Sequence, residues 1–212
     1  MKYEKIRNEV LEAILQAVDL GLINGTSGNI ALKDEKEDVI AITPSGIDYK
    51  KMKAEDIAII DMDGQWIDGK YKPSSETPMH TAVIRARKDV RATVHTHGMF
   101  ATIMAMEGLP LQPVTPPQSE FVPVNIVPFV MPGSNDLAGK VVETLGEERA
   151  VLLTNHGMFC CGKTIKDAMA ATIYTEEMAQ TTYYAKLLGT YKPLPDEAIK
   201  KMKELIAADK AV

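Results

Sequence analysis

The chain has 212 residues, of which 45% are hydrophobic and 25% are charged, values typical of a globular protein that buries a substantial core in one domain. Its formal net charge is −5, and no basic stripe marks a nucleic-acid-binding surface. No apolar run approaches the length of a membrane span, and the first residues lack a secretion signal. We therefore expect one domain over residues 1–212, a cytoplasmic location, and no nucleic-acid or membrane partner.

Hydrophobic periodicity divides the chain into mixed helices and strands. Residues 6–18 repeat apolar side chains at helical spacing, and Gly21 marks the end of that helix. Thr77 is expected to cap the next helix, and six prolines between residues 108 and 128 argue against regular structure there. Further helices are expected at 77–88, 99–107, 135–145, 165–188 and 197–208. Strands are expected at 30–32, 39–42, 57–60, 150–153 and 158–161, and leading into residues 95–97.

Hairpin signals between the predicted strands, such as Asp63-Gly64 before Trp66, favour an antiparallel or mixed sheet. The two cysteines, Cys160 and Cys161, are adjacent in a predicted strand, where neighbouring side chains point to opposite faces. A disulfide between them is therefore not expected, in agreement with a reducing compartment.

Two of the four histidines, His95 and His97, follow a run of apolar and β-branched residues that is typical of a strand. Side chains two residues apart on a strand share one face, so both imidazoles can reach one ion. The pair alone fits two polar side chains on a solvated strand equally well. His156 follows the separate apolar run 150–153, and three histidines match a catalytic zinc site with one open position. The fourth, His80, is expected behind the ligands or at the surface.

Glu76 directly precedes the helix predicted for residues 77–88 and directly follows Ser74 and Ser75. An acid at a helix start commonly complements the helix dipole and has no further role. Two hydroxyl groups and the free N–H groups of a helix N-terminus nevertheless suit a phosphate. An acid beside a phosphate is costly unless it binds a metal or moves a proton, so Glu76 is a candidate for both roles.

Two further turns, Gly25-Thr26-Ser27-Gly28-Asn29 and Thr43-Pro44-Ser45-Gly46, offer donors to an anion. Each turn by itself is more typical of a plain chain reversal. Glycine lets the backbone approach an anion closely, and the hydroxyl and amide side chains add donors. Because none of these motifs contains lysine or arginine, we expect a phosphate held by neutral groups.

These motifs occur in the order and approximate spacing of the class II aldolase/adducin family, which the chain resembles over nearly its whole length. The resemblance rests on residues 25–29, 43–46, 74–76, 95–97 and 155–157. It implies a three-layer α/β/α sandwich around a mostly antiparallel, mixed central sheet. It also implies a homotetramer with active sites at subunit interfaces.

The resemblance further implies a role for each site residue. Zn²⁺ is bound by Glu76, His95, His97 and His156, and Glu76 is also the catalytic acid/base. The residues implied for the substrate phosphate are Thr26, Gly28, Asn29, Ser45, Gly46, Ser74 and Ser75.

Within the family, the chain most resembles bacterial enzymes that cleave L-fuculose 1-phosphate to dihydroxyacetone phosphate and L-lactaldehyde, a step of fucose degradation. In that lyase reaction a base removes the C4 hydroxyl proton and the C3–C4 bond breaks. The metal stabilises the resulting enediolate, so no Schiff-base lysine is needed. Glu76 then protonates C3 of the enediolate, or removes that proton in the synthetic direction.

The chain departs from these aldolases at the aldehyde end of the site. They use a tyrosine from a neighbouring subunit, after the histidine pair, and another near the C-terminus. Residues 111–122 contain no tyrosine, and none follows Tyr191. Glu120 and Tyr183 are the candidates for the missing acid/base. The 5-deoxyribulose, rhamnulose, methylthioribulose and ribulose phosphates therefore stay open as substrates.

Other functions fit parts of the sequence. L-Ribulose-5-phosphate 4-epimerases resemble the chain but have aspartate where Glu76 stands, which favours an aldolase. A methylthioribulose-1-phosphate dehydratase, which also belongs to the family, is a second alternative enzyme function for this chain. The intact ligands argue against a non-catalytic, adducin-like interaction module. Zinc hydrolysis or hydration, outside the family, would leave the serine and glycine motifs without a role.

Overall fold

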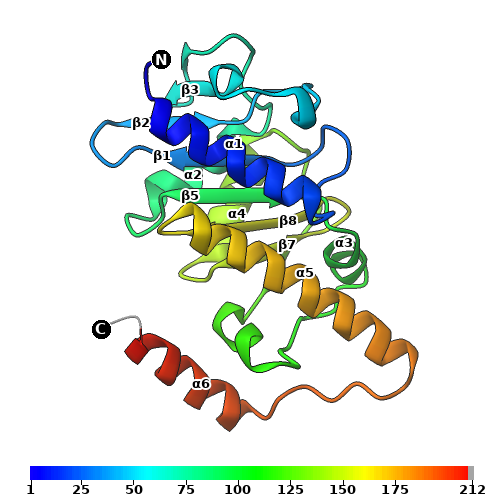
Figure 1. Ribbon diagram of the computed structural model, residues 1–212. Helices are drawn as coiled ribbons and strands as arrows, with labels where there is room; N and C mark the ends of the chain where they lie inside the picture. Colours follow the sequence, from blue (N-terminus) through cyan, green and yellow to red (C-terminus); the bar gives the residue numbers. More distant parts are fainter. Residues whose placement is uncertain (210–212) are drawn as a thin grey trace.

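One eight-stranded sheet forms the middle layer of the molecule (Figure 1). In the computed structural model, which describes residues 1–209, the strands follow the order β4-β3-β2-β1-β5-β8-β7-β6. Neighbouring strands are antiparallel except β6 and β7, which are parallel, so the predicted mixed sheet is confirmed. The strands are Asn29–Lys33 (β1), Val39–Ile42 (β2), Ala58–Asp61 (β3), Trp66–Asp68 (β4), Ala92–Thr96 (β5), Asn125–Val127 (β6), Ala150–Leu153 (β7) and Gly157–Gly162 (β8).

Helices cover both faces of the sheet, which confirms the three-layer sandwich (Figure 1). The side chains of Ile30 and Leu32 belong to the apolar core under α1, whereas that of Ala31 belongs to the core under α2 and α4. This alternation is the period of two expected of a strand that is buried on both faces. The helices on the first face are α1 (Glu4–Asp19), α3 (Met99–Met106) and α5 (Ile165–Leu187), and those on the second face are α2 (Thr77–Ala86) and α4 (Asn135–Leu145).

The two cysteines follow the same alternation along β8. Cys160 lies in the core beneath α3 and α5, and Cys161 lies in the core beneath α2 and α4. Both thiols are free and buried. Their side chains therefore point to opposite faces of the sheet, as predicted.

The proline-rich segment 108–128 contains more regular structure than predicted. Residues Pro116–Phe121 form a 3-10 helix (η3), and β6 follows it at the edge of the sheet. Pro116 and Pro117 fit the first turn of η3, where the missing N–H is not needed. β6 pairs with β7, which lies beyond α4 in the chain, so local composition does not reveal this strand.

Two short 3-10 helices, Tyr49–Lys51 and Ala54–Asp56, connect β2 to β3. The last helix, α6 (Asp196–Asp209), lies beside η3, where the ammonium group of Lys203 donates a hydrogen bond to the carbonyl of Val122. Within residues 1–209, no helix combines the length and apolar composition needed to cross a membrane.

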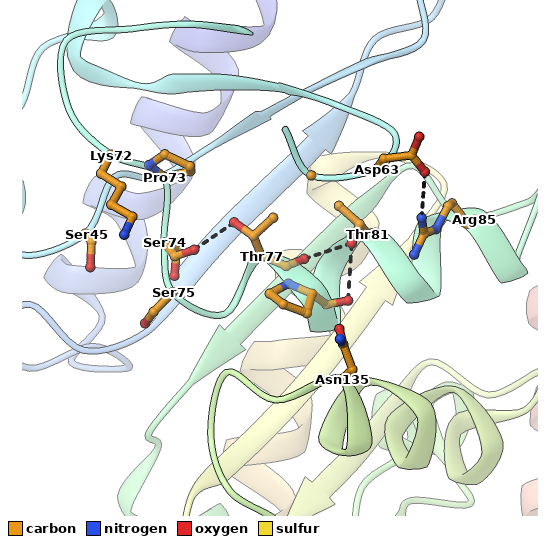
Figure 2. A pocket seen from close by; sticks show the side chains of 12 residues that line it. Ser45, Asp63, Lys72, Pro73, Ser74, Ser75, Thr77, Thr81, Arg85 and Asn135 are labelled. Atoms are coloured by element: carbon orange, nitrogen blue, oxygen red, sulfur yellow. Dashed lines mark hydrogen bonds and ion pairs between the residues drawn. The ribbon is translucent and has the colours of Figure 1, made fainter. Parts of the chain in front are cut away.

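The start of α2 differs from the predicted cap. The helix begins at Thr77, so Thr77 is not its cap, and Glu76 occupies the N-cap position without a capping side-chain hydrogen bond. The hydroxyl of Thr77 instead donates to the carbonyl oxygen of Ser74, at 2.7 Å (Figure 2). Because Pro78 has no N–H, the first turn has one donor fewer to satisfy. The Glu76 carboxylate is therefore not used to cap α2 and can serve another site.

Candidate active site

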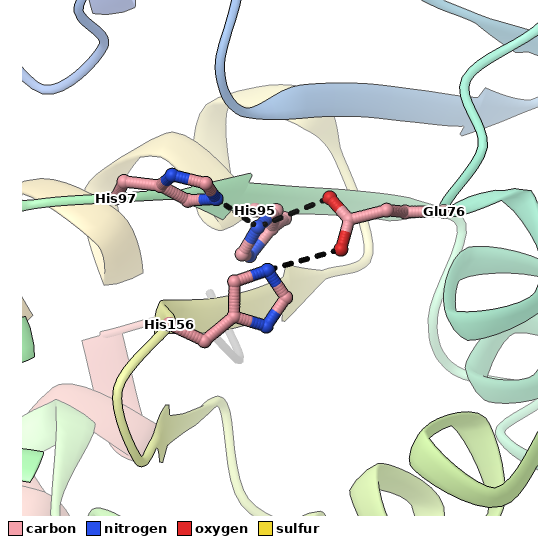
Figure 3. Close-up of side chains that lie close together, drawn as sticks. All are labelled: Glu76, His95, His97 and His156. Atoms are coloured by element: carbon pink, nitrogen blue, oxygen red, sulfur yellow. Dashed lines mark hydrogen bonds and ion pairs between the residues drawn. The ribbon is translucent and has the colours of Figure 1, made fainter. Parts of the chain in front are cut away.

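Four side chains from separate parts of the chain converge at one end of β5 (Figure 3). Glu76 precedes α2, His95 lies in β5, His97 follows β5, and His156 lies between β7 and β8. Their ligand atoms all lie within 4.8 Å of one another. His95 Nε2 is 3.0 Å from His97 Nε2 and 3.2 Å from Glu76 Oε2, and His156 Nε2 is 3.1 Å from Glu76 Oε1. The structure thus brings all four predicted metal ligands together.

The orientation of His95 is set by β8. His95 faces Phe159 of β8 across the ladder, and its Nδ1 lies 2.8 Å from the carbonyl oxygen of Met158. Since a carbonyl only accepts, Nδ1 carries the proton and donates it. Nε2 of the neutral ring therefore keeps its lone pair and directs it into the cluster, an arrangement common for metal-binding histidines.

His156 reaches the cluster because two strands approach closely at Gly157. Asn155 has a positive φ of 54°, and Gly157 has a φ of 149° at the start of β8. A Cβ atom at position 157 would lie 2.1 Å from the carbonyl oxygen of Thr96. Only glycine allows β8 to begin this close to the end of β5, and this contact brings His156 beside His97.

The cluster fits a divalent metal ion. Glu76 and His95 are buried, His156 is half-buried and His97 is exposed, so the site is closed on its inner side and open at His97. His156 Nε2 is within ion-pair distance of Glu76 Oε1, yet this oxygen has no partner with hydrogen-bond geometry. Hydrogen bonds leave this carboxylate oxygen unsatisfied, and together with three imidazole nitrogens it forms a donor set that zinc and other divalent metals accept. Their role as ligands remains a prediction.

The protonation states also suit ligands. Although part of His97 is exposed, its ring is partly desolvated within the cluster, and this desolvation, aided by the neighbouring imidazoles, lowers the pKa of His97 to about 4, so the ring is neutral at pH 7. Burial alone would raise the pKa of Glu76, but the contacts with His156 and His95 outweigh burial and hold this pKa well below its usual range. The cluster therefore presents an anionic oxygen beside the nitrogen ligands, which favours binding of a cation.

Asn29 and His80 lie behind Glu76. Asn29 Nδ2 donates to Glu76 Oε2 at 2.9 Å, and Asn29 Oδ1 forms a hydrogen bond with His80 Nε2. His80 is fully buried, so its predicted position behind the ligands is confirmed and the surface alternative is wrong. The side chain of Asn29, predicted to bind phosphate, is instead directed at the carboxylate of Glu76.

The other residues predicted to bind the substrate phosphate lie in two separate parts of the structure. Ser45, Ser74 and Ser75 line one pocket of about 480 Å³ beside Glu76 (Figure 2). Two backbone hydrogen bonds join the segments that supply these serines: Ser45 N donates to Lys72 O, and Ser74 N donates to Thr43 O. Gly46 is exposed next to Ser45, with a φ of 73°.

The glycine turn lies outside this pocket lining. Thr26 is exposed, and Gly28 packs against β5, where a Cβ atom would lie 2.9 Å from the carbonyl oxygen of His95. Asn29 pairs with His95 across the β1–β5 ladder. The turn is thus adjacent to the histidine cluster, which the spacing of the motifs did not reveal.

A cationic side chain in the pocket was missed from the sequence. Lys72 lines the same pocket as Ser45 and Ser74, and Figure 2 shows its amine extending toward these serines. Arg85 lines the pocket too, but it is paired with Asp63 at 3.0 Å, whereas within residues 1–209 no carboxylate pairs with Lys72. The pocket lined by the predicted serines is therefore not purely neutral, and phosphate binding there stays a prediction. The signal available was the position of Lys72 two residues before Ser74.

The two candidates for the aldehyde end lie elsewhere. Glu120 is in η3, and Tyr183 is on α5, where its ring packs 5.6 Å from that of Phe100. Neither residue lines the pocket of Figure 2. Their proposed role in catalysis therefore stays a prediction.

Comparison with known proteins agrees with this geometry. Residues 8–183 match the family model of the class II aldolase and adducin N-terminal domain. A 5-deoxy-D-ribulose 1-phosphate aldolase of Bacillus thuringiensis serovar kurstaki is 36% identical over 203 residues, which are 95% of each chain. An L-ribulose-5-phosphate 4-epimerase of Salmonella paratyphi B is 29% identical over 93% of each chain.

The fold also matches a solved structure closely. An L-fuculose 1-phosphate aldolase superimposes with a TM-score of 0.92, is 30% identical, and is covered over 98% of both chains. The prediction of a class II aldolase, a metal-dependent lyase, is confirmed by these relatives together with the cluster of possible ligands. The chain therefore belongs to the class II aldolase and adducin family.

Proposed function

We propose that this protein is a zinc-dependent aldolase that cleaves the 1-phosphate of a terminally deoxygenated ketose. The observation that carries the proposal is the cluster of Glu76 and three histidines, joined through Glu76 to a pocket that contains Lys72, because the pocket residues Ser75 and Thr77 flank Glu76 in the chain. The cluster suits chemistry on a carbonyl and a neighbouring hydroxyl, and the pocket suits a phosphate. A ketose 1-phosphate carries its phosphate a few bonds from a carbonyl group and a neighbouring hydroxyl group, so one such molecule could occupy both places.

Two substrates are favoured by the relatives. Two of these relatives are named as aldolases of 5-deoxy-D-ribulose 1-phosphate and of L-fuculose 1-phosphate, and both sugars end in a methyl group. Cleavage of C3–C4 releases dihydroxyacetone phosphate from either, with acetaldehyde from the first and L-lactaldehyde from the second. We place 5-deoxy-D-ribulose 1-phosphate first, because that relative is the more similar in sequence and because the tyrosines expected for L-fuculose 1-phosphate are absent.

The mechanism assigns each group a task. A bound Zn²⁺ supplies Lewis-acid stabilisation of the negative charge that develops on the substrate oxygens. Ser45, Ser75 and Lys72 bind the phosphate and so fix the position of C3 relative to Glu76. A general base takes the C4 hydroxyl proton, the aldehyde carbonyl forms, and the electrons of the C3–C4 bond remain on the dihydroxyacetone phosphate fragment as an enediolate. Glu76, which is ionised at rest, takes up a proton from solvent and passes it to C3; in synthesis its carboxylate removes that proton.

The proposal includes a cytoplasmic homotetramer, as the resemblance implies. Exposed apolar side chains on α3 and on the last turns of α5 offer a surface that subunit contacts would cover. They are Met99, Met106, Tyr184, Leu187 and Leu188. Light scattering during size-exclusion chromatography tests the tetramer.

The test of function is cleavage of the two deoxyketose 1-phosphates, measured through coupled reduction of dihydroxyacetone phosphate. Each assay is run with Zn²⁺ and after chelation, and L-ribulose 5-phosphate is included to detect epimerisation. Chelator-sensitive cleavage that is fastest with 5-deoxy-D-ribulose 1-phosphate supports the full proposal. Fastest cleavage of L-fuculose 1-phosphate keeps the reaction and changes the substrate. Epimerisation without release of dihydroxyacetone phosphate contradicts the proposed reaction.

A further inference from the structure

A buried line of hydrogen bonds leads from Glu76 into the core. Glu76 Oε2 accepts from Asn29 Nδ2 at 2.9 Å, and Asn29 Oδ1 bonds to His80 Nε2. His80 Nδ1 lies 2.7 Å from the hydroxyl oxygen of Thr93. Glu76 and Asn29 are buried, and His80 and Thr93 are fully buried. The line joins the loop before α2, β1, α2 itself and β5, so its geometry depends on the packing of the whole site.

Only one direction of these hydrogen bonds satisfies every atom. The carboxylate of Glu76 accepts and cannot donate, so the Asn29 amide must turn its NH₂ group toward it. Asn29 Oδ1 then faces His80 and requires a donor, which is His80 Nε2–H. His80 Nδ1 is left to accept from the hydroxyl of Thr93. The opposite tautomer of His80 would turn the carbonyl oxygen of Asn29 against the carboxylate.

Burial keeps His80 in a single charge state. It lowers the pKa of this imidazole to about 3, so the ring is neutral near pH 7 and carries one proton. A neutral ring has one donor and one acceptor nitrogen, which matches its two partners. His80 does not belong to the cluster of possible ligands and does not line the pocket of Figure 2.

We propose that His80 and Asn29 are positioning residues that hold the Glu76 carboxylate by Oε2 and leave Oε1 free for its work at the reacting carbon. The inference rests on the proposed function of Glu76. Turning the Asn29 amide toward a phosphate would break both of its hydrogen bonds and leave the buried His80 Nε2–H without an acceptor.

The first experiment follows the exchange of the C3 hydrogen of dihydroxyacetone phosphate with deuterium in the zinc-loaded enzyme. The variants are Asn29→Ala, His80→Leu and the double variant, with Glu76→Gln as the reference for loss of the acid/base. His80→Gln tests rescue, because its amide can still donate to Asn29. The control is Val83→Ala, a truncation of another fully buried side chain on α2 that forms no part of the line.

Each single variant is expected to lower kcat for exchange by about 10- to 100-fold, the range typical of groups that orient a catalytic residue. The double variant should be no slower than the slower single variant, because both residues act through the same contact. KM for dihydroxyacetone phosphate should change by less than about twofold, and His80→Gln should recover part of kcat. Val83→Ala should lower thermal stability without this loss of kcat.

Several outcomes overturn the inference. A raised KM with unchanged kcat in Asn29→Ala makes the side chain a phosphate ligand. If the losses of kcat in the two single variants add up in the double variant, Asn29 and His80 do not act through the same contact with Glu76. Equal kcat in His80→Leu and Val83→Ala would mean that His80 has only a structural role. If Glu76→Gln abolishes exchange while both single variants exchange normally, this inference fails and the proposed function stands. Undiminished exchange in Glu76→Gln rejects the proposed function itself.

A second measurement is independent of activity. In ¹H–¹⁵N spectra of histidine-labelled protein, His80 should be the Nε2–H tautomer with a slowly exchanging proton. The signal should disappear in His80→Leu and should shift and exchange faster in Asn29→Ala. If the wild-type protein instead contains the Nδ1–H tautomer of His80, the Asn29 amide must be oriented the other way, with its oxygen toward Glu76, and the proposal is overturned.

Discussion

The histidine cluster and the serine-lined pocket beside it differ in how their side chains are held. In the cluster, His95 is bound from behind by the carbonyl of Met158, and Glu76 is bound by Asn29. In the pocket, Ser45, Lys72 and Ser75 are exposed. The cluster is thus assembled by contacts with the core, while these three pocket side chains are exposed to solvent.

This difference indicates how the site divides its work. Chemistry on a carbon atom requires reacting groups in fixed positions, and buried hydrogen bonds supply that order before the substrate arrives. A phosphate is a large anion that several donors can bind in more than one geometry. Changes in the cluster should therefore remove activity, and changes in the pocket should weaken binding.

The largest effect is expected for His97→Ala. Removal of one ligand should abolish tight zinc binding, and the metal supplies several kcal/mol of stabilisation, so cleavage should fall by about a thousandfold or more. Zinc content by mass spectrometry and kcat/KM measure the two losses together. Circular dichroism is the control for folding, because His97 is exposed and its truncation leaves the core intact. Full zinc occupancy with retained activity would remove the metal argument.

Glu76→Gln should have the next largest effect. Glutamine has nearly the same shape but cannot exchange a proton at C3, so exchange of the C3 hydrogen should fall by about 10²- to 10⁴-fold. The amide also replaces an anionic ligand by a neutral one, so zinc affinity should fall as well. Assays at saturating zinc separate the two effects. Exchange at the wild-type rate would show that another group is the base.

Two glycines allow the same comparison in terms of stability. Gly157→Ala forces a Cβ atom against the carbonyl oxygen of Thr96 and should lower the free energy of unfolding by about 3 kcal/mol or more. Gly46→Ala meets no atom within 4 Å and has only the strain of its positive φ, so its cost should be about 1 kcal/mol. Urea unfolding measures both. Equal costs would mean that close packing does not distinguish the cluster from the pocket.

Local patterns predict much of the fold and of the cluster. The period of two places His95 and His97 on one face, and the apolar run before His156 predicts a second strand end. Helical periodicity predicts α1, α4 and α5 to within a few residues. These features depend on neighbours in the chain, which is why a single sequence reveals them.

The remaining features depend on contacts between distant segments. The orientation of Asn29 is set by His80, 51 residues away, and Lys72 enters the pocket because its segment pairs with the turn that contains Ser45. The edge strand β6 exists through pairing with β7. The position of Lys72 two residues before Ser74 is a local signal, but the orientation of Asn29 and the pairing of these segments are not set by local properties and could not be predicted from the chain alone.

Lys72→Ala is expected to affect binding and not the chemical step. Loss of a charge-assisted hydrogen bond to phosphate should raise KM about tenfold and leave kcat unchanged. The effect should shrink at high ionic strength, because Lys72 is exposed and salt screens it. Lys70→Ala is the matched control, since Lys70 does not line the pocket but carries the same charge. Equal KM values in the two variants would place the phosphate elsewhere.

The two adjacent serines should show the smallest effects and repeat the comparison within one dipeptide. Ser75 is exposed in the pocket, so Ser75→Ala should raise KM about threefold, the value of one hydrogen bond, and leave kcat unchanged. Ser74 is buried, and its hydroxyl accepts a hydrogen bond from the backbone N–H of Glu76 at 3.2 Å. Ser74→Ala should therefore lower kcat as well, because it loosens the residue that moves the proton. If both variants change only KM, the hydrogen bond from the backbone N–H of Glu76 to Ser74 does not position the carboxylate. Ser74 would then act in substrate binding, like Ser75, and not in the chemical step.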